Sequence, residues 1–111
     1  MSVNQIAEEK RLNKERVALR DALLRLYKNK DFKAVIEEAF MEKDCARYAR
    51  MSGLVTNSPE VREDALAKCQ AAGHLKEYFH AVEMMGNRAE ANLRDIEESE
   101  AELVAEYREE A

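Results

Sequence analysis

Helix-breaking and turn-forming residues are scarce in this sequence. Its 111 residues include three glycines and one proline. A β-sandwich or barrel needs a turn about every ten residues, so this scarcity excludes an all-β fold. No apolar run approaches the ~20 residues of a transmembrane helix, which predicts that no membrane is a partner. Because polar residues follow Met1, we also expect no secretory signal.

Cysteine and aromatic residues are few as well. Tryptophan is absent, and Cys45 and Cys69 are too few for a disulfide scaffold, which favours a reducing compartment. The abundant residues are Ala, Glu, Lys, Leu and Arg, and 37% of the chain is charged. This composition is typical of long helices. At this length we expect a single helical domain that covers residues 1–111.

The net charge of −5 hides an uneven distribution. Residues 1–30 hold eight basic and four acidic side chains. Residues 31–89 hold eight basic and ten acidic side chains, and residues 90–111 hold two basic and nine acidic ones. The two ends are therefore opposite in sign and are expected to attract each other, within one chain or between chains.

Apolar spacing predicts three helices, at about residues 4–28, 32–51 and 59–108. The first helix has an expected packing face of apolar residues spaced mainly three and four apart: Leu12, Val17, Leu19, Leu23, Leu24, Leu26 and Tyr27. Its opposite face carries basic side chains: Arg11, Lys14, Arg20, Arg25 and Lys28.

The second helix has Asp31 as its expected N-cap, because an Asp side chain accepts a hydrogen bond from a free backbone N–H. Gly53 is expected to end the helix in the left-handed conformation that glycine adopts at little cost. The apolar face between them comprises Phe32, Val35, Ile36, Ala39, Phe40 and Tyr48.

The third helix has the clearest start signal, with Ser58 as N-cap, Pro59 at the first helical position and Glu60 in the first turn. From there, fourteen positions recur at alternating steps of four and three, and eleven of them are apolar, which predicts a sustained heptad seam. The seam comprises Val61, Ala65, Lys68, Ala72, Leu75, Phe79, Val82, Gly86, Ala89, Leu93, Ile96, Glu100, Leu103 and Tyr107.

Two glycines fall inside this third helix, at positions 73 and 86. Each costs about 1 kcal/mol relative to alanine in a helix interior. Either glycine could bend the helix or could admit a closely packed neighbour.

Two all-α architectures fit these lengths. One is a compact three-helix bundle from which the last twenty or so residues project. The other is an elongated hairpin in which the first two helices both run antiparallel to the long third helix, with the basic first helix beside the acidic C-terminal half. A two-layer hairpin has a thin core, so self-association or docking on a larger surface is expected. The expected packing or interface residues are Leu75, Phe79, Val82, Leu93, Ile96, Leu103 and Tyr107.

The residue spacing does not favour a metal or catalytic site. His74 and His80 are six apart and Cys69 and His74 are five apart, so neither pair shares a helix face. Cys45 has basic neighbours but no histidine close in sequence that could orient it, so a packed cysteine is the simpler interpretation. No phosphate-binding glycine loop or nucleophile elbow occurs. We therefore expect no enzyme activity, no catalytic residue, no metal and no cofactor.

Nucleic-acid binding is disfavoured by the net negative charge. The basic face of the first helix lacks interleaved aromatic residues, and its simpler role is to complement the acidic tail. That tail could alternatively imitate the phosphates of DNA, although two arginines and an apolar seam dilute its charge.

Three segments resemble small helical proteins of tailed bacteriophages: residues 29–36 (NKDFKAVI), 40–48 (FMEKDCARY) and 71–79 (AAGHLKEYF). The similar proteins share an N-x-D-F-K-x-V-I opening, an acidic-to-arginine stretch, a small-Gly-x-Leu-x-x-aromatic segment and an acidic helical tail. The resemblance covers roughly residues 20–105. It transfers no functional residue, because the shared pattern marks helix starts and packing positions.

The resemblance implies a role in the virion or in its assembly, since such proteins are typically encoded among virion structural genes. The leading hypothesis is a non-enzymatic, oligomeric structural protein that acts through helix–helix association with itself or with capsid, portal or tail proteins. The alternative is a small phage regulatory adaptor or inhibitor that binds a host protein. Either role places the protein in the virion or in the host cytoplasm.

Overall fold

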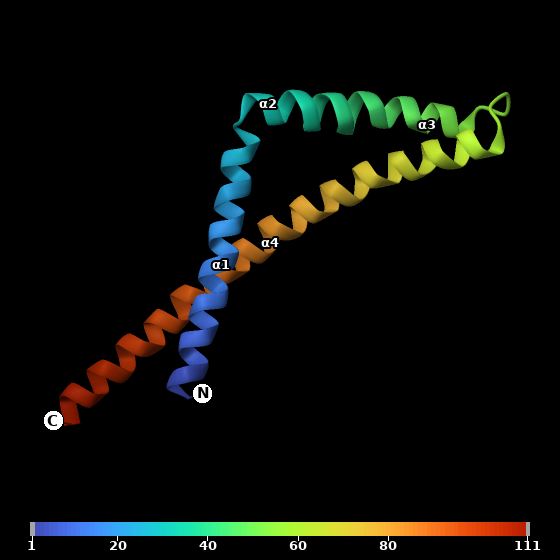
Figure 1. The fold of residues 1–111 in the computed structure, drawn as a ribbon. Coiled ribbons are helices and arrows are strands. Elements are labelled where there is room, and N and C mark those ends of the chain that lie inside the picture. The colour runs from blue at the N-terminus through green and yellow to red at the C-terminus, as the bar shows by residue number, and fades with distance from the viewer. Residues whose placement is uncertain (1, 111) are drawn as a thin grey trace. The chain divides into compact units, whose positions relative to one another are not determined.

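The computed structural model describes residues 2–110, and helices account for almost all of them (Figure 1). No strand is present in this range, so the all-α fold class with a long C-terminal helix is confirmed. The elements in chain order are α1 (Val3–Tyr27), α2 (Lys30–Phe32), the π-helix η1 (Lys33–Asp44), α3 (Cys45–Gly53) and α4 (Pro59–Glu110). Because α2, η1 and α3 follow one another without a gap, together they form the second predicted helix. Every predicted helix end lies within two residues of the observed one.

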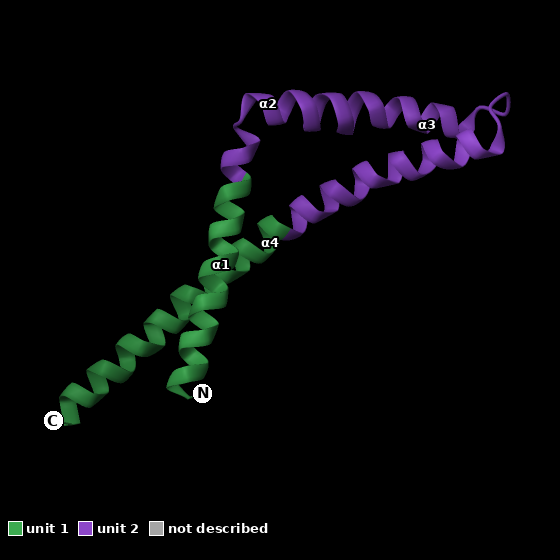
Figure 2. Ribbon diagram, viewed as in Figure 1, with its two compact units in different colours: residues 1–23, 82–111 green, residues 24–81 purple. Residues whose placement is uncertain are grey.

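The chain divides into two compact units, and α4 contributes to both (Figure 2). Unit 1 contains residues 2–23 and 82–110, and unit 2 contains residues 24–81. Each unit is held by contacts between an early helix and one part of α4.

Within each unit the paired helices are antiparallel. In unit 1, Lys10 of α1 contacts Glu100 of α4, and Arg20 contacts Glu90, so residue numbers rise along α1 as they fall along α4. In unit 2, α3 and the first part of α4 are joined by the short connection at residues 54–58. The first two predicted helices therefore pair with different parts of the third, as the hairpin arrangement predicts.

The helix starts are fixed by side-chain caps. Asn29 has an extended backbone, and its Oδ1 accepts a hydrogen bond from the Phe32 N–H at 2.9 Å. The prediction of Asp31 as N-cap was wrong, because this bond starts the helix at Lys30 and leaves Asp31 in the first turn. For α4, the Ser58 Oγ accepts from the Val61 N–H at 3.3 Å, which confirms the predicted cap.

The end of α3 differs from the sequence-based expectation. Gly53 is the last residue of the helix, and no described glycine has a positive φ angle, so the predicted left-handed cap was wrong. Side chains bind the terminal carbonyl oxygens instead. The Asn57 Nδ2 donates to the Met51 oxygen at 3.1 Å, and the Arg62 Nε donates to the Ser52 oxygen at 3.1 Å. Because free carbonyls at a helix end need such donors, these two bonds replace the glycine cap.

The π-helix η1 was not predicted from the sequence. Its wider winding is visible where it ends, because the N–H of Cys45 donates to the carbonyl oxygen of Phe40, five residues back. In an ordinary α-helix, residues four apart are displaced by about 40° around the axis, so a row with that spacing soon leaves the packing face. A π-helix has more than four residues per turn, so residues four apart are displaced in the opposite direction around the axis. A row with this spacing that passes from an α-helix into a π-helix therefore stays on the packing face.

The half-buried residues of the η1 region form two neighbouring rows with this spacing of four. One row is Phe32, Ile36, Phe40, Asp44 and Tyr48, and the other is Glu37, Met41 and Cys45. Val35 and Ala39 were predicted on the same face, but both are exposed. The wider winding rotates these two positions away from α4.

Most of the buried apolar positions are small. Five apolar residues are buried: Leu23, Val82 and Ala89 in unit 1, and Ala65 and Ala72 in unit 2. Among residues 2–110, no large side chain is fully buried. Alanine lets two helix backbones approach closely, because the distance between helix axes depends on the side chains at the contact. Apart from Leu23 and Val82, the large apolar residues therefore lie beside the contact line or on the surface.

Aromatic rings fill one end of unit 2. Phe79 of α4 lies edge-on to Tyr27 with ring centroids 6.0 Å apart, and its centroid is 5.8 Å from that of Phe32. Tyr27 and Phe32 are themselves 6.2 Å apart. Such tilted and edge-to-face pairs are favourable ring geometries. Phe79 thus joins the end of α1 and the start of α2 to α4.

We expect Phe79→Ala to lower the free energy of unfolding by about 2–3 kcal/mol, because the ring is only half-buried and its loss opens the aromatic cluster. Urea unfolding followed by circular dichroism measures the change. The adjacent Tyr78 is 57% exposed, so Tyr78→Ala is a matched control that should cost less than about 1 kcal/mol. Equal losses in the two variants would contradict a packing role specific to Phe79.

Candidate helix-association site

The contact between α1 and α4 in unit 1 is centred on Gly86. A Cβ atom placed at Gly86 would lie 2.2 Å from the Cβ of Arg20. Glycine has no side chain at this point, so the α1 backbone beside Arg20 approaches the α4 backbone closely. At Gly73, by contrast, a Cβ would meet nothing within 4 Å. The sequence offered two roles for these glycines, which were bending the helix or admitting a close neighbour. Gly86 has the second role, because it lets α1 pack closely against α4.

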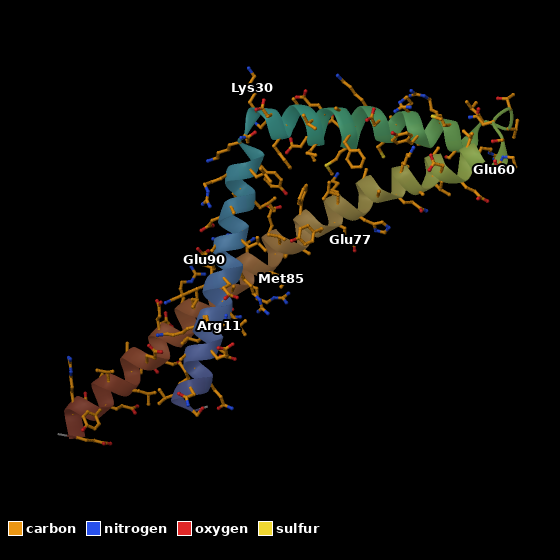
Figure 3. The ribbon with its side chains drawn as sticks, in the orientation of Figure 1. Arg11, Lys30, Glu60, Glu77, Met85 and Glu90 are labelled. Atoms are coloured by element: carbon orange, nitrogen blue, oxygen red, sulfur yellow. The ribbon has the colours of Figure 1, made fainter. Side chains whose placement is uncertain are left out.

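Arg20 occupies the space that Gly86 leaves. The Arg20 side chain is largely buried, and its guanidinium donates to the Asn87 Oδ1 at 2.9 Å and to both Glu90 carboxylate oxygens at 3.3 Å. It also binds Asp21 at 3.0 Å. A buried guanidinium needs acceptors for its N–H groups, and this arrangement supplies them. Glu90 belongs to α4, and Figure 3 labels it beside α1, near the point where the two helices pass each other.

The ion pair shifts the pKa values of both partners. The hydrogen bond from Arg20, and then its positive charge, lowers the pKa of Glu90. The hydrogen bonds to Glu90 and Asp21 raise the pKa of Arg20. Both shifts favour the charged forms, so the contact is strongest where Glu90 is ionised.

Two further polar contacts extend the site along α1. The buried Asn13 donates through Nδ2 to the Glu9 carbonyl oxygen at 2.8 Å and accepts from the Asn92 Nδ2 at 3.5 Å. Lys10 forms an ion pair with Glu100 at 2.7 Å. Together with Arg20 and Glu90, this pair confirms that the basic first helix binds the acidic end of the chain, within one molecule.

The predicted packing face of α1 was partly wrong. Leu12, Leu19 and Leu26 are exposed, whereas Asn13 and Arg20 are buried against α4. Successive helical residues are about 100° apart, so the face that carries Asn13 and Arg20 turns Leu12 and Leu19 aside. Leu23 is buried and Val17 is half-buried, as predicted. The face that packs in unit 1 consists of residues three or four apart that are half polar and half apolar: Ile6, Lys10, Asn13, Val17, Arg20 and Leu23. A search for apolar residues alone misses this pattern.

The structure separates the predicted seam residues into three groups. Val82 is buried. Leu75, Phe79, Leu93 and Ile96 are half-buried. Leu103 and Tyr107 are exposed, Tyr107 to 75%. All residues from 101 to 110 are exposed, so the last turns of α4 carry seam positions that no described residue covers. Leu103 and Ile96 also line a shallow pocket of about 180 Å³ with Ile6.

Two sequence signals could have revealed this site. Gly86 and Ala89 are consecutive seam positions with small side chains, which is where a neighbouring backbone can come closest. Asn13 and Arg20 lie seven residues apart and therefore share a helix face. Both signals are visible in the sequence, but neither states which residue of one helix meets which residue of the other.

Across residues 2–110, no three His, Cys, Asp or Glu side chains are grouped closely enough to hold a metal ion. None of the helices in the described part of the chain is both long and apolar enough to cross a membrane. Comparisons with protein-family models, with curated proteins and with solved structures find no match to this chain. The resemblance to phage proteins therefore depends on the three quoted segments.

We expect Gly86→Ala to lower the free energy of unfolding by about 1–3 kcal/mol, although alanine is the better helix former. The added methyl group meets the Cβ of Arg20, which cannot move away as the end of a flexible side chain could, so the two helices must separate. Gly73→Ala is the matched control and should stabilise the protein by about 0.5–1 kcal/mol, because the new methyl group meets no neighbour. Urea unfolding of both variants measures the difference. If both changes stabilised the protein, the close approach at Gly86 would be disproved.

We expect Glu90→Gln to destabilise the protein at pH 7 and to have a smaller effect at pH 3. The pKa of Glu90 is lowered in the folded protein, so its ionised form adds stability above the usual glutamate value of about 4.3, and this contribution is lost as the pH falls through the lowered pKa. Thermal unfolding of the wild type and the variant between pH 3 and pH 7 measures the difference. Glu97→Gln changes an exposed residue of the same helix and serves as the control. A difference that stays constant across this pH range would count against the ion pair.

Proposed function

We propose that this protein is a non-enzymatic structural or assembly component of tailed bacteriophage particles. It acts through helix–helix association, with itself or with capsid, portal or tail proteins. The phage-like segments support the viral assignment, and the exposed apolar residues of unit 1 support association as the mode of action. Such a protein belongs in the virion or in the cytoplasm of the infected host.

The observation that carries the proposal is the exposed pair Leu12 and Leu19 on α1, which we call the leucine edge. The two side chains are one heptad apart, so they lie on the same face of the helix. Leu19 is 52% exposed and Leu12 is 37% exposed. Asn13 and Arg20 occupy the contact with α4, so the leucines stay available to another helix. Covering them would remove apolar surface from water, at about 25 cal/mol per Å².

The thin core gives a second reason for association. Three of the five buried apolar residues are alanines, and the described residues contain no large side chain that is fully buried. Exposed apolar residues also continue along α4, at Met84, Met85, Leu103 and Val104. A chain that buries so little apolar surface by itself gains stability when a partner covers the remainder.

We expect the wild-type protein to associate at micromolar concentration and Leu12→Glu/Leu19→Glu to weaken that association at least tenfold. Two charges on the leucine edge would have to be buried without partners, which is costly. Sedimentation velocity over a concentration series measures the change. Ala7→Glu/Ala18→Glu adds the same charge to exposed positions of α1 away from the leucine edge and should leave association intact. Circular dichroism verifies that both variants stay helical.

A wild-type protein that remains a folded monomer at these concentrations would remove self-association from the proposal. The particle role is tested by mass spectrometry of purified phage particles and of assembly intermediates, where the protein should be present in a fixed ratio to the major structural proteins. Its absence from both would overturn the structural role. A single stoichiometric host protein recovered by pull-down would instead establish the adaptor function.

A further inference from the structure

The two cysteines of the chain meet in unit 2. Cys45 is the first residue of α3, Cys69 lies on α4, and their sulfur atoms are 3.3 Å apart. The Cys45 thiol also donates a weak hydrogen bond to the Cys69 carbonyl oxygen at 3.7 Å. Both residues are free thiols, and both are half-buried, so solvent reaches the pair. Sequence spacing did not predict this contact, because the residues are 24 positions apart on different helices.

We propose that Cys45 and Cys69 form an oxidation site at which hydrogen peroxide produces an intramolecular disulfide that links α3 to α4. The site is independent of the leucine edge and of the proposed virion role, since it involves only residues of unit 2. Nothing in it requires a metal or a further protein.

The chemistry has two steps. The Cys69 thiolate attacks one peroxide oxygen, an S–O bond forms and the O–O bond breaks, and the released hydroxide takes a proton to become water. The Cys45 sulfur then attacks the sulfur of the resulting sulfenic acid, so the S–S bond forms and the S–O bond breaks. The Cys45 proton leaves with the hydroxide as a second water. In total, two thiols lose two electrons and two protons, and one peroxide becomes two waters.

The surroundings of the pair assign the two roles. Its hydrogen bond with Cys69, together with partial burial and the nearby Cys69 charge, raises the pKa of Cys45. The Cys45 thiol also donates its hydrogen to the Cys69 carbonyl oxygen. This geometry assigns Cys45 as the resolving thiol and leaves Cys69 as the sulfur that meets the peroxide. Because the sulfurs already touch, the second step needs no movement of the helices and competes well with reaction between molecules.

The disulfide would close a loop that contains the whole connection between α3 and α4. Closing a loop of this length reduces the freedom of the unfolded chain and so stabilises the folded one. Oxidation would link α3 covalently to the first part of α4, and a thiol reductant would break this link.

We expect one equivalent of hydrogen peroxide to lower the intact mass of the monomeric wild-type protein by about 2 Da, the mass of the two hydrogens lost when a disulfide forms. Both thiols should become unreactive toward iodoacetamide. The thermal midpoint should rise by about 10 °C and return to its starting value with dithiothreitol. Intact-mass spectrometry, tryptic mapping and thermal unfolding measure these effects.

The matched control is Cys45→Ala/Ala46→Cys, which keeps two cysteines but moves one thiol about 100° around the helix to an exposed position. This variant should form the intramolecular disulfide at least tenfold more slowly. Cys45→Ala alone should stop at the sulfenic acid or form disulfides between chains. The proposal is overturned if the folded wild-type protein retains two free thiols, if it forms only intermolecular disulfides, or if the moved thiol reacts equally fast.

Discussion

The backbone of α4 at Gly86 lies so close to α1 that not even a methyl group fits between them. This single approach decides how unit 1 is built. It places the stem of Arg20 against α4 and directs its guanidinium to Asn87 and Glu90. Once Arg20 is fixed there, Asn13 and Lys10 meet Asn92 and Glu100 further along the same pair of helices. The acidic end of the chain thus serves as the counter-charge for the basic first helix.

The same approach has a consequence for the apolar residues. A helix has room for only one packing face against one partner, and in α1 two of the three buried positions of that face, Asn13 and Arg20, are polar. Leu12 and Leu19 are left at its edge, and the small residues of α4 offer no deep pocket to receive them. The polar residues of this face pair with α4 within the chain, whereas Leu12 and Leu19 remain exposed. Our functional proposal depends on this division.

Unit 2 follows a related principle with different residues. Ala65 and Ala72 allow the close contact, and the rings of Tyr27, Phe32 and Phe79 close one end. The π-helix η1 ends at Asp44, directly before Cys45, so its wider winding contributes to the orientation of that residue. A change of helix type over twelve residues therefore bears on whether two distant thiols meet. The segment stays helical, but the π-helical winding changes which of its side chains face α4.

The sequence by itself determined the properties that depend on neighbouring residues. Apolar spacing and the Ser58–Pro59 signal located all three helices, because capping and amphipathic periodicity act within a few residues. The charge distribution correctly paired the two ends of the chain. Leu75, Phe79, Val82, Leu93 and Ile96 were also recognised as a stripe on one helix, although Leu103 and Tyr107 lie beyond the part of α4 that is covered.

Only the tertiary structure decided which face of each helix is used. The choice of Asn13 and Arg20 over Leu12 and Leu19 depends on the space at Gly86, which lies more than sixty residues away. The end of α3 depends on donors from Asn57 and Arg62, and the contact between Cys45 and Cys69 depends on the winding of η1 and on its register against α4. Helical periodicity repeats locally and is readable along the chain, whereas the angle and register at which two helices meet are set jointly by both surfaces.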